Sequence, residues 1–411
     1  MVAPYKAGPF LGVNNKLPGD KLRVPRTASG GGGAFVRDAV NADLTAAGSF
    51  QRRPGSTLVL AGNRCRSLWA AGDAGYFADG NRLLRFDGIG TVQVGALSAA
   101  DALVSFTQTP RGVVWSDASQ LCLIGGASSR PLAVPAPNPE PAVAAGSGGS
   151  LPQGSYLVAF ANLNSAGERS ALTPFNVVAV PANGAIDLTF AAGRTLDIQV
   201  FVSAVDGSQL YSEAIVAAAA TSARLVLVTS QGSPVTDELE AAMPPGSIVR
   251  EYRGRLLTAY GNTLFYSNPY DYGTYRPATG YVLLDAPVTL CEPDEDGVYI
   301  ATALKTWFCR GADFASADLQ LIAPFGAIPN TAVAEPNTLN LLWSTPRGAA
   351  RAANGALVLV QDANVAFSQA SNGAALFREE NGLSQLISVL TGVVPTGAAS
   401  ASSYMDAETV N

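Results

Sequence analysis

The densest groups of side chains that could do chemistry in this sequence are acidic. Asp294, Glu295 and Asp296 are consecutive, and Glu379 and Glu380 form a second group. Glycoside hydrolysis needs two carboxyl groups that converge on a substrate. Adjacent residues of a strand or turn point in different directions, so neither group meets this need by itself. We expect both to be solvated turns, and a cleft built from Asp residues of separate segments stays open as an alternative.

Histidine is absent from the sequence, and the four cysteines are far apart. Without histidine, Ser-His-Asp and Cys-His catalysis and most zinc chemistry are excluded. The cysteines, Cys65, Cys122, Cys291 and Cys309, lack the spacing of metal ligands. Cys122 and Cys309 lie within apolar runs, where a free thiol acts as a small hydrophobic side chain. We therefore expect buried free thiols.

Two further patterns fall short of a ligand site. The run Gly30–Gly33 has neither the Lys-Ser/Thr ending nor the strand-to-helix setting of a phosphate-binding loop. Asp20, Asp38, Asp43 and Asp79 lie outside any Asp-x-Asp-x-Asp-Gly calcium loop. The sequence therefore predicts a protein that is not an enzyme, with no catalytic residue, no metal site and no cofactor.

The tryptophans indicate packing rather than ligand binding. Trp69, Trp115, Trp307 and Trp343 fall in or beside expected strands, one for each of four presumed repeats. Interfaces between repeated sheets need bulky side chains at repeated positions. We expect the four rings to fill such interfaces rather than to form a platform for sugars.

Length, composition and charge narrow the class of protein. A chain of 411 residues holds one large repeat fold or two to three ordinary domains, and 48% hydrophobic residues supply a sizeable core. The excess of 32 Asp and Glu over 26 Lys and Arg gives a net charge of −6. This charge argues against tight nucleic-acid binding through phosphate neutralisation. A neutral or mildly acidic wall would still suit a channel through which DNA slides.

Neither a membrane span nor an export signal is expected. The longest apolar run, residues 214–220, is far shorter than the roughly 18 residues that cross a bilayer. The N-terminus lacks the apolar core of a secretory signal. We expect synthesis in a cytoplasm and no membrane span.

From Cys65 onward, strand and turn signals dominate. An apolar strand, a short turn of Asp, Gly, Asn or Ser, and a second apolar strand recur along the chain, which predicts β-hairpins. The five expected hairpins span residues 75–88, 112–125, 255–267, 297–311 and 355–368.

The spacing of these hairpins predicts the fold. Asp79 and Asp117, in the first two turns, are 38 residues apart, and Gly261 and Ala303 are 42 apart. These intervals are close to the length of a four-stranded propeller blade. The next interval, from Ala303 to Asp362, is 59 residues and fits a blade with a long loop. We expect an all-β fold that contains a β-propeller of about six blades, with a range of five to seven.

Residues 136–230 interrupt this spacing. The Pro-rich stretch 134–141 and the run Gly146–Ser150 have the composition of a linker, and five or six strand signals follow. About 100 residues suit an immunoglobulin- or fibronectin III-like β-sandwich. We expect this sandwich to be inserted between a first propeller part, residues 35–135, and a second part with the C-terminal tail, residues 231–411.

Two segments precede the hairpins. Residues 1–34 contain four prolines and no regular period, so we expect an extended arm held by its own chain or, preferably, by a neighbouring subunit. Residues 35–55 are expected to form two extended pieces joined by a turn with a positive φ at Gly48. Their charged side chains would fix geometry through charge-assisted hydrogen bonds. We also expect this segment to supply strands that close the ring with the last blade.

The same region resembles the signature of a bacteriophage protein family. The order Gly12-Val-Asn-Asn, Arg37-Asp-Ala-Val-Asn-Ala-Asp and Gly48-Ser-Phe-Gln-Arg-Arg-Pro-Gly55 is similar to tail hub or nozzle proteins of short-tailed phages, also called packaged-DNA stabilisation proteins. Residues 245–267, 296–299 and 306–308 look like blade sequences of the same group. The resemblance implies structural roles for Arg37, Asp38, Asn41, Asp43, Gly48, Arg52, Arg53, Pro54, Gly55, Gly254, Arg255 and Asn262.

The resemblance also implies a function and partners. Members of this family form a ring, usually a homohexamer, that narrows the tail channel, retains packaged DNA and passes it during ejection. By resemblance, this chain would be a virion structural protein of the tail, assembled in the bacterial cytoplasm. Its partners would be other copies of itself, the head-to-tail adaptor or portal proteins above, and needle, plug or fibre proteins below. Double-stranded DNA would pass through it without specific binding.

Two other classes of function stay open. A carbohydrate-binding or glycoside-hydrolysing propeller would need carboxylates or aromatic rings that converge in one cleft. A fibre-attachment protein or adhesin of the same tail would share the β-rich composition and form trimers.

Overall fold

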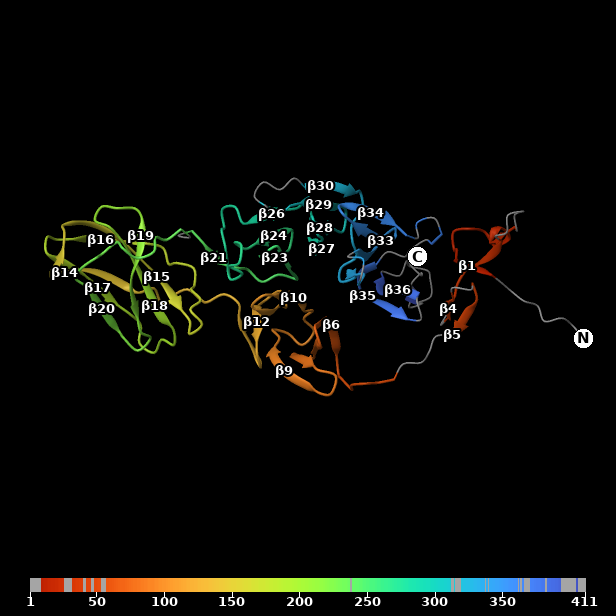
Figure 1. Ribbon diagram of the computed structural model, residues 1–411, viewed down its shortest axis with the longest axis horizontal. Helices are drawn as coiled ribbons and strands as arrows, with labels where there is room; N and C mark the ends of the chain where they lie inside the picture. Colours follow the sequence, from red (N-terminus) through yellow and green to blue (C-terminus); the bar gives the residue numbers. More distant parts are fainter. Residues whose placement is uncertain are drawn as a thin grey trace, which may run out of the picture. The chain divides into compact units, whose positions relative to one another are not determined.

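The computed structural model describes residues 9–25, 32–39, 42–45, 48–52, 57–236, 239–311, 314, 319–336, 338, 340–360, 362, 364–365, 370–380, 383–392 and 404–405. Their regular secondary structure consists of strands and short 3-10 turns such as η1 (Gly19–Lys21), so the all-β prediction is confirmed (Figure 1). The chain divides into two compact units. We call residues 64–260 and 264–282 the middle unit, and residues 1–63, 261–263 and 283–411 the terminal unit.

The middle unit begins with two four-stranded antiparallel sheets in simple sequence order. The first contains β6 (Cys65–Ala71), β7 (Ala74–Asp79), β8 (Arg82–Phe86) and β9 (Thr91–Ala96). The second contains β10 (Ser105–Thr109), β11 (Gly112–Ser116), β12 (Leu121–Gly125) and β13 (Ser128–Pro131).

A third sheet of the same kind follows much later in the sequence. It contains β22 (Ile248–Tyr252), β23 (Arg255–Tyr260), β24 (Thr263–Tyr266) and β26 (Tyr281–Leu283). Two short strands, β21 (Ala241–Ala242) and β25 (Thr274–Tyr275), form a separate pair. In sequence, β21 precedes this sheet and β25 lies between β24 and β26. The expected hairpins at 75–88, 112–125 and 255–267 are therefore present.

Aromatic side chains pack these sheets against one another. One hydrophobic cluster joins the first and second sheets and contains Tyr76, Phe106 and Trp115. The ring of Trp69 stacks on that of Phe106, with centroids 5.6 Å apart and planes within 10°. A second cluster joins β11 and β12 to β22 and β23 through residues such as Leu256. Consecutive sheets of this unit thus pack face to face.

The expected insert forms two sheets. A three-stranded sheet has the order β14-β17-β20, and a four-stranded sheet has the order β16-β15-β18-β19. Their strands are β14 (Ala142–Leu151), β15 (Gly154–Leu163), β16 (Asn176–Val180), β17 (Gly184–Thr189), β18 (Asp197–Ser203), β19 (Leu210–Val216) and β20 (Ser222–Leu225). One hydrophobic cluster takes side chains from both sheets, including Phe160, Ile186 and Val200, which are fully buried.

The expectation of a linker at residues 146–150 is wrong. These residues belong to β14, which pairs with β17 through Ser147 and Leu151 with an irregularity between them. A Cβ atom on Gly149 would lie 2.1 Å from the carbonyl oxygen of Gly184. The glycines are there because two backbones approach closely, and not because the chain is flexible.

The C-terminal part of the terminal unit contains two more four-stranded sheets and a three-stranded one. The first has β27 (Val288–Pro293), β28 (Gly297–Thr302), β29 (Thr306–Arg310) and β30 (Leu319–Ala323), and the second has β31 (Val333–Ala334), β32 (Leu341–Thr345), β33 (Gly348–Ala353) and β34 (Ala356–Leu359). The third has β35 (Ala370–Glu380), β36 (Leu383–Gly392) and β37 (Tyr404–Met405). Tyr299, Phe308 and Trp343 lie in one cluster that joins the first two sheets.

The expected hairpin at 297–311 is present as β28 and β29. At 355–368 the first expected strand is present as β34, and most of the second lies outside the described residues. The turn that ends β33 lies at Asn354 and Gly355, which have φ values of 53° and 80°. Paired positive φ angles are typical of a type I′ hairpin turn, which favours Asn-Gly. The fully buried second strand of this sheet is β32, and the turn after it is Pro346-Arg347. The interval between the turns at Ala303 and Pro346 is 43 residues. It replaces the interval of 59 residues to Asp362 and is close to the intervals of 38 and 42 residues between the other turns.

The N-terminal region folds onto the terminal unit. β1 (Phe10–Val13) and β2 (Arg23–Val24) flank β3 (Gly33–Val36), and β4 (Ala42–Leu44) pairs with β5 (Phe50–Arg52). Gly48 has a φ of 70°, as expected. Among the described residues, β3, β4 and β5 pair with no strand of the C-terminal sheets. The strands that we expected residues 35–55 to supply to the last blade are therefore not seen there.

Other expectations concern burial and membrane association. Cys122, Cys291 and Cys309 are buried free thiols, whereas Cys65 is exposed. Trp115 and Trp343 are 1% and 0% exposed, which confirms that these rings are packed. None of the described helices has the length and hydrophobicity that a bilayer span requires.

Candidate functional site

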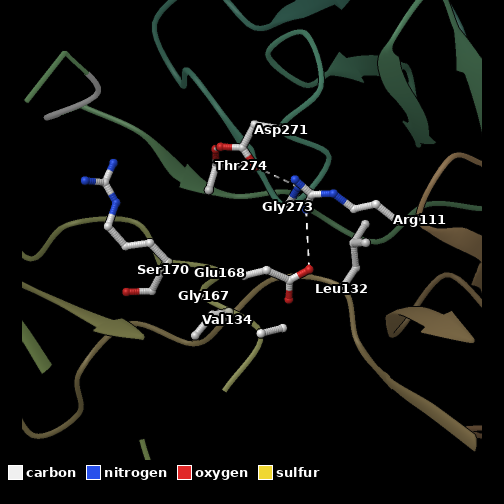
Figure 2. Close-up of a pocket in the computed structure, with 11 residues that line it drawn as sticks. Arg111, Leu132, Val134, Gly167, Glu168, Ser170, Asp271, Gly273 and Thr274 are labelled. Carbon is white, nitrogen blue, oxygen red and sulfur yellow. Dashed lines mark hydrogen bonds and ion pairs between the residues drawn. The ribbon is translucent and has the colours of Figure 1, made fainter. Parts of the chain in front are cut away.

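A cavity of about 580 Å³ lies within the middle unit. Its walls come from four stretches that are far apart in sequence: Arg111, residues 132–134, residues 166–170 and residues 271–274 (Figure 2). Arg111 and Glu168 point toward one another across it. Charged side chains and the apolar side chains of Leu132 and Val134 line it together.

Arg111 is positioned by the turn between β10 and β11. Thr109 Oγ1 donates to the carbonyl of Gly112 at 2.8 Å and accepts from the backbone N–H of Arg111 at 3.3 Å. The guanidinium lies 5.8 Å from the centroid of the Tyr272 ring and donates to the carbonyl of Tyr270 at 3.1 Å. A cation over an aromatic face is favourable, so this side chain is held in place on two sides.

Glu168 is positioned by the loop between β15 and β16. The side-chain oxygen of Asn164 accepts from the backbone N–H groups of Ala166 and Glu168 at 3.0 and 2.9 Å, which folds the loop back on itself. The carboxylate then lies 2.7 and 2.9 Å from Nη2 of Arg130 and 3.5 Å from Nη1 of Arg111. Two guanidinium groups of the β10–β13 sheet therefore share one carboxylate of the insert.

The surroundings of Glu168 favour its charged form. Burial alone would raise its pKa, but hydrogen bonds from Arg130 and Asn164 and the charges of Arg130 and Arg111 outweigh burial, so the pKa is lowered. A carboxylate held in this way is a poor general acid near neutral pH.

Asp271 and Thr274 also line the cavity, and Glu240 lies behind them in contact with Thr274. Thr274 Oγ1 is 2.8 Å from Asp271 Oδ2 and 2.6 Å from Glu240 Oε2. A hydroxyl group donates one proton, so it satisfies one carboxylate at a time. Across the described ranges, no cluster of three His, Cys, Asp or Glu could hold a metal ion.

The acidic side chains of Asp294 and Asp296 make hydrogen bonds and an ion pair within the fold. Asp294 accepts from the backbone N–H groups of Glu295 at 2.7 Å and Asn354 at 2.8 Å. Asp296 lies 3.9 Å from Arg310. In the second group, Glu379 is exposed, and the side chain of Glu380 lies outside the described residues. The described geometry therefore offers no converging pair of carboxylates at residues 294–296.

Among the N-terminal family-motif positions, Asp43 has the most enclosed side chain. It is 7% exposed and lies 3.3 Å from Nη2 of Arg378. Arg37, Asp38 and Arg52 are exposed. A Cβ atom on Gly48 would lie 2.9 Å from Pro9. Positions Asn41, Arg53, Pro54 and Gly55 lie outside the described residues.

The later family-motif positions lie at turns. Gly254 has a φ of 80° and packs under the ring of Tyr270, where a Cβ atom would lie 2.9 Å from the ring. Arg255 donates to the carbonyl of Ser267 at 2.8 Å. The side chain of Asn262 donates to the carbonyl of Leu284 at 3.3 Å. These residues complete backbone hydrogen bonds at strand ends, and none of them lines the cavity.

Sequence reasoning missed the Arg111–Glu168 pair. The two residues are 57 positions apart and belong to different expected domains, so no local pattern joins them. One signal was available. The sequence Thr-Pro-Arg-Gly occurs at residues 109–112 and again at 345–348, where Thr345 Oγ1 donates to the carbonyl of Gly348 at 2.7 Å and Arg347 lies 5.2 Å from the ring of Phe325. This repeat marks a turn that holds an arginine against an aromatic ring.

Comparisons with known proteins add little. No protein-family model and no curated protein matches the chain. A streptogramin B lyase structure matches with 13% identity over 80% of this chain and 92% of that chain, at a TM-score of 0.33. The N-terminal domain of Nup159 matches with 11% identity over 79% of this chain and 73% of that chain, at a TM-score of 0.28. Both are β-propeller proteins, and at these TM-scores the likeness carries no argument for this chain.

Proposed function

We propose that this chain is a structural virion protein of the tail hub or nozzle of a short-tailed bacteriophage, which retains packaged DNA and passes it during ejection. The observation that carries the proposal is the way the resembling N-terminal residues are used. Asn14, which is 3% exposed, donates to Oδ1 of Asn364 at 3.1 Å, and Asp43 pairs with Arg378. These contacts join segments from the two ends of the chain, which supports a structural role for the resembling residues.

The proposal includes a β-propeller of about six blades with an inserted β-sandwich. Five four-stranded antiparallel sheets in sequence order, packed face to face within each unit, support the propeller. The two sheets of residues 142–225 that share one core support the sandwich.

The proposed assembly is a homohexameric ring. Adaptor or portal proteins would bind above it, and needle, plug or fibre proteins below it. The net charge of −6 fits a channel wall that does not retain DNA through phosphate contacts.

The test is the mass of the purified protein in solution together with its symmetry in electron micrographs. We expect a sixfold ring with an axial hole as wide as a DNA duplex. A stable monomer that forms no ring, alone or mixed with portal and adaptor proteins, would overturn the proposal. Glycan binding should then be measured, because a carbohydrate-binding propeller is the alternative function.

A further inference from the structure

Polar contacts join the insert to the β10–β13 sheet and to the stretch that follows the sheet. Arg130 and Arg111 of the sheet meet Glu168 of the insert, and the side chain of Asn162 donates to the carbonyl of Pro135 at 2.8 Å. The cavity of about 580 Å³ is bounded by both parts, with Leu132 and Val134 on one side and Gly167 and Ser170 on the other. A joint sealed by apolar packing would leave no hollow of this size.

The insert has a hydrophobic core of its own. One hydrophobic cluster lies between its two sheets. A second cluster, which includes Phe201, Leu210 and Val235, covers the other face of the four-stranded sheet. The stretch 132–141 leads into it, and the chain leaves it after Val235. A body with complete cores and two short connections can turn as a unit.

We infer that Glu168, Arg111 and Arg130 form an ionic latch that sets the orientation of the insert against the β10–β13 sheet, and that opening the latch lets the insert swing as a body. The three side chains are 21%, 39% and 39% exposed. Ion pairs that water can reach are weak and are screened by salt. High salt or the loss of one charged partner would therefore open the latch, and a partner that presents carboxylate or phosphate groups to the two arginines would compete with Glu168.

Distances between two spin labels on the full-length chain test the latch. With Cys65→Ser in place, the remaining cysteines are buried, and labels are attached at Asp73→Cys, between β6 and β7, and Ala182→Cys, between β16 and β17. We expect one narrow distribution of label-to-label distances when Glu168, Arg111 and Arg130 are all retained. Glu168→Gln, which keeps the side-chain volume, and Arg130→Gln should each at least double its width.

Two further measurements keep the test decisive. Asp101→Asn removes an exposed carboxylate of the same unit and should leave the distribution narrow. Raising the salt from about 50 mM to about 1 M should broaden the distribution without any substitution, because the screening length falls to about 3 Å. Equal widths in the latch variants, the control and high salt would overturn the inference, and so would a broad distribution in the unsubstituted chain. Neither outcome depends on whether copies assemble into a ring.

Discussion

At the scale of single residues, the cysteines differ sharply in their surroundings. Burial, together with the negative charge of Asp117, raises the pKa of Cys122 to about 11. Cys291 and Cys309 are 1% and 0% exposed, whereas Cys65 is exposed. Because the thiolate is the reactive form, we expect one thiol per native chain to react with a disulfide reagent near pH 8, and four after unfolding. Mass spectrometry should find the label on Cys65, and Cys65→Ser should abolish it. Labelling of a second cysteine in the native chain would contradict the burial described here.

Glu168 predicts how stability depends on pH. Its folded pKa is lowered from the ordinary value of 4.5, so its contribution is present above that value and is lost as the pH falls through the folded pKa. Glu168→Gln removes the titrating group. We expect the free energy of unfolding in urea to fall less between about pH 6 and about pH 3 in this variant than in the unsubstituted chain. Asp101→Asn is the control, and equal pH dependence in Glu168→Gln and the unsubstituted chain would argue against the pairing.

At the scale of elements, β14 depends on glycine where it approaches β17. Gly149→Ala would place a methyl group 2.1 Å from the carbonyl oxygen of Gly184, so the two backbones must separate. We expect a loss of about 1–3 kcal/mol in the free energy of unfolding of the insert, measured with urea. Gly90→Ala is the matched control, because its Cβ atom would meet nothing within 4 Å. An equal free energy of unfolding in the two variants would show that β14 accommodates the added methyl group without loss of stability.

At the scale of the whole molecule, chain ends distant in sequence are tied together. Asn14 bonds to Asn364, and Asp43 to Arg378, across 350 and 335 positions. Asp43→Ala leaves a partly buried arginine without this carboxylate, which we expect to cost about 1–3 kcal/mol. The same variant should speed tryptic cleavage after Lys16 and Lys21, read by mass spectrometry. Asp38→Ala removes an exposed carboxylate of the same region, and trypsin should cleave this variant as fast as the unsubstituted chain.

The sequence was informative where local patterns decide the structure. Alternating apolar residues around Gly80, Gly261 and Ala303 predicted real hairpins. The hairpin at Asn354 and Gly355 was missed because β33 is Gly-Ala-Ala-Arg-Ala-Ala, whose small side chains give no alternating signal. The run 146–150 was taken as a linker because composition does not reveal that a neighbouring backbone lies within contact distance.

The candidate site was beyond the reach of local patterns. Arg111 and Glu168 meet because the chain leaves β13, forms strands β14 and β15, and returns in a loop. Only the three-dimensional path brings them together. The absence of a histidine excluded the His-dependent triads and dyads from the sequence alone, because that inference depends on residue type and not on position.

Trp115 and Trp343 provide each unit with an internal optical probe. Both indoles are fully buried, and neither N–H has a hydrogen-bond partner. An indole in such dry, apolar surroundings emits at shorter wavelength than one in water. Trp115 belongs to the middle unit and Trp343 to the terminal unit, so two variants that each retain one of these tryptophans, with the other three replaced by Phe, would report separately on the melting of each unit. A difference between the two emission curves would show which half of the chain opens first.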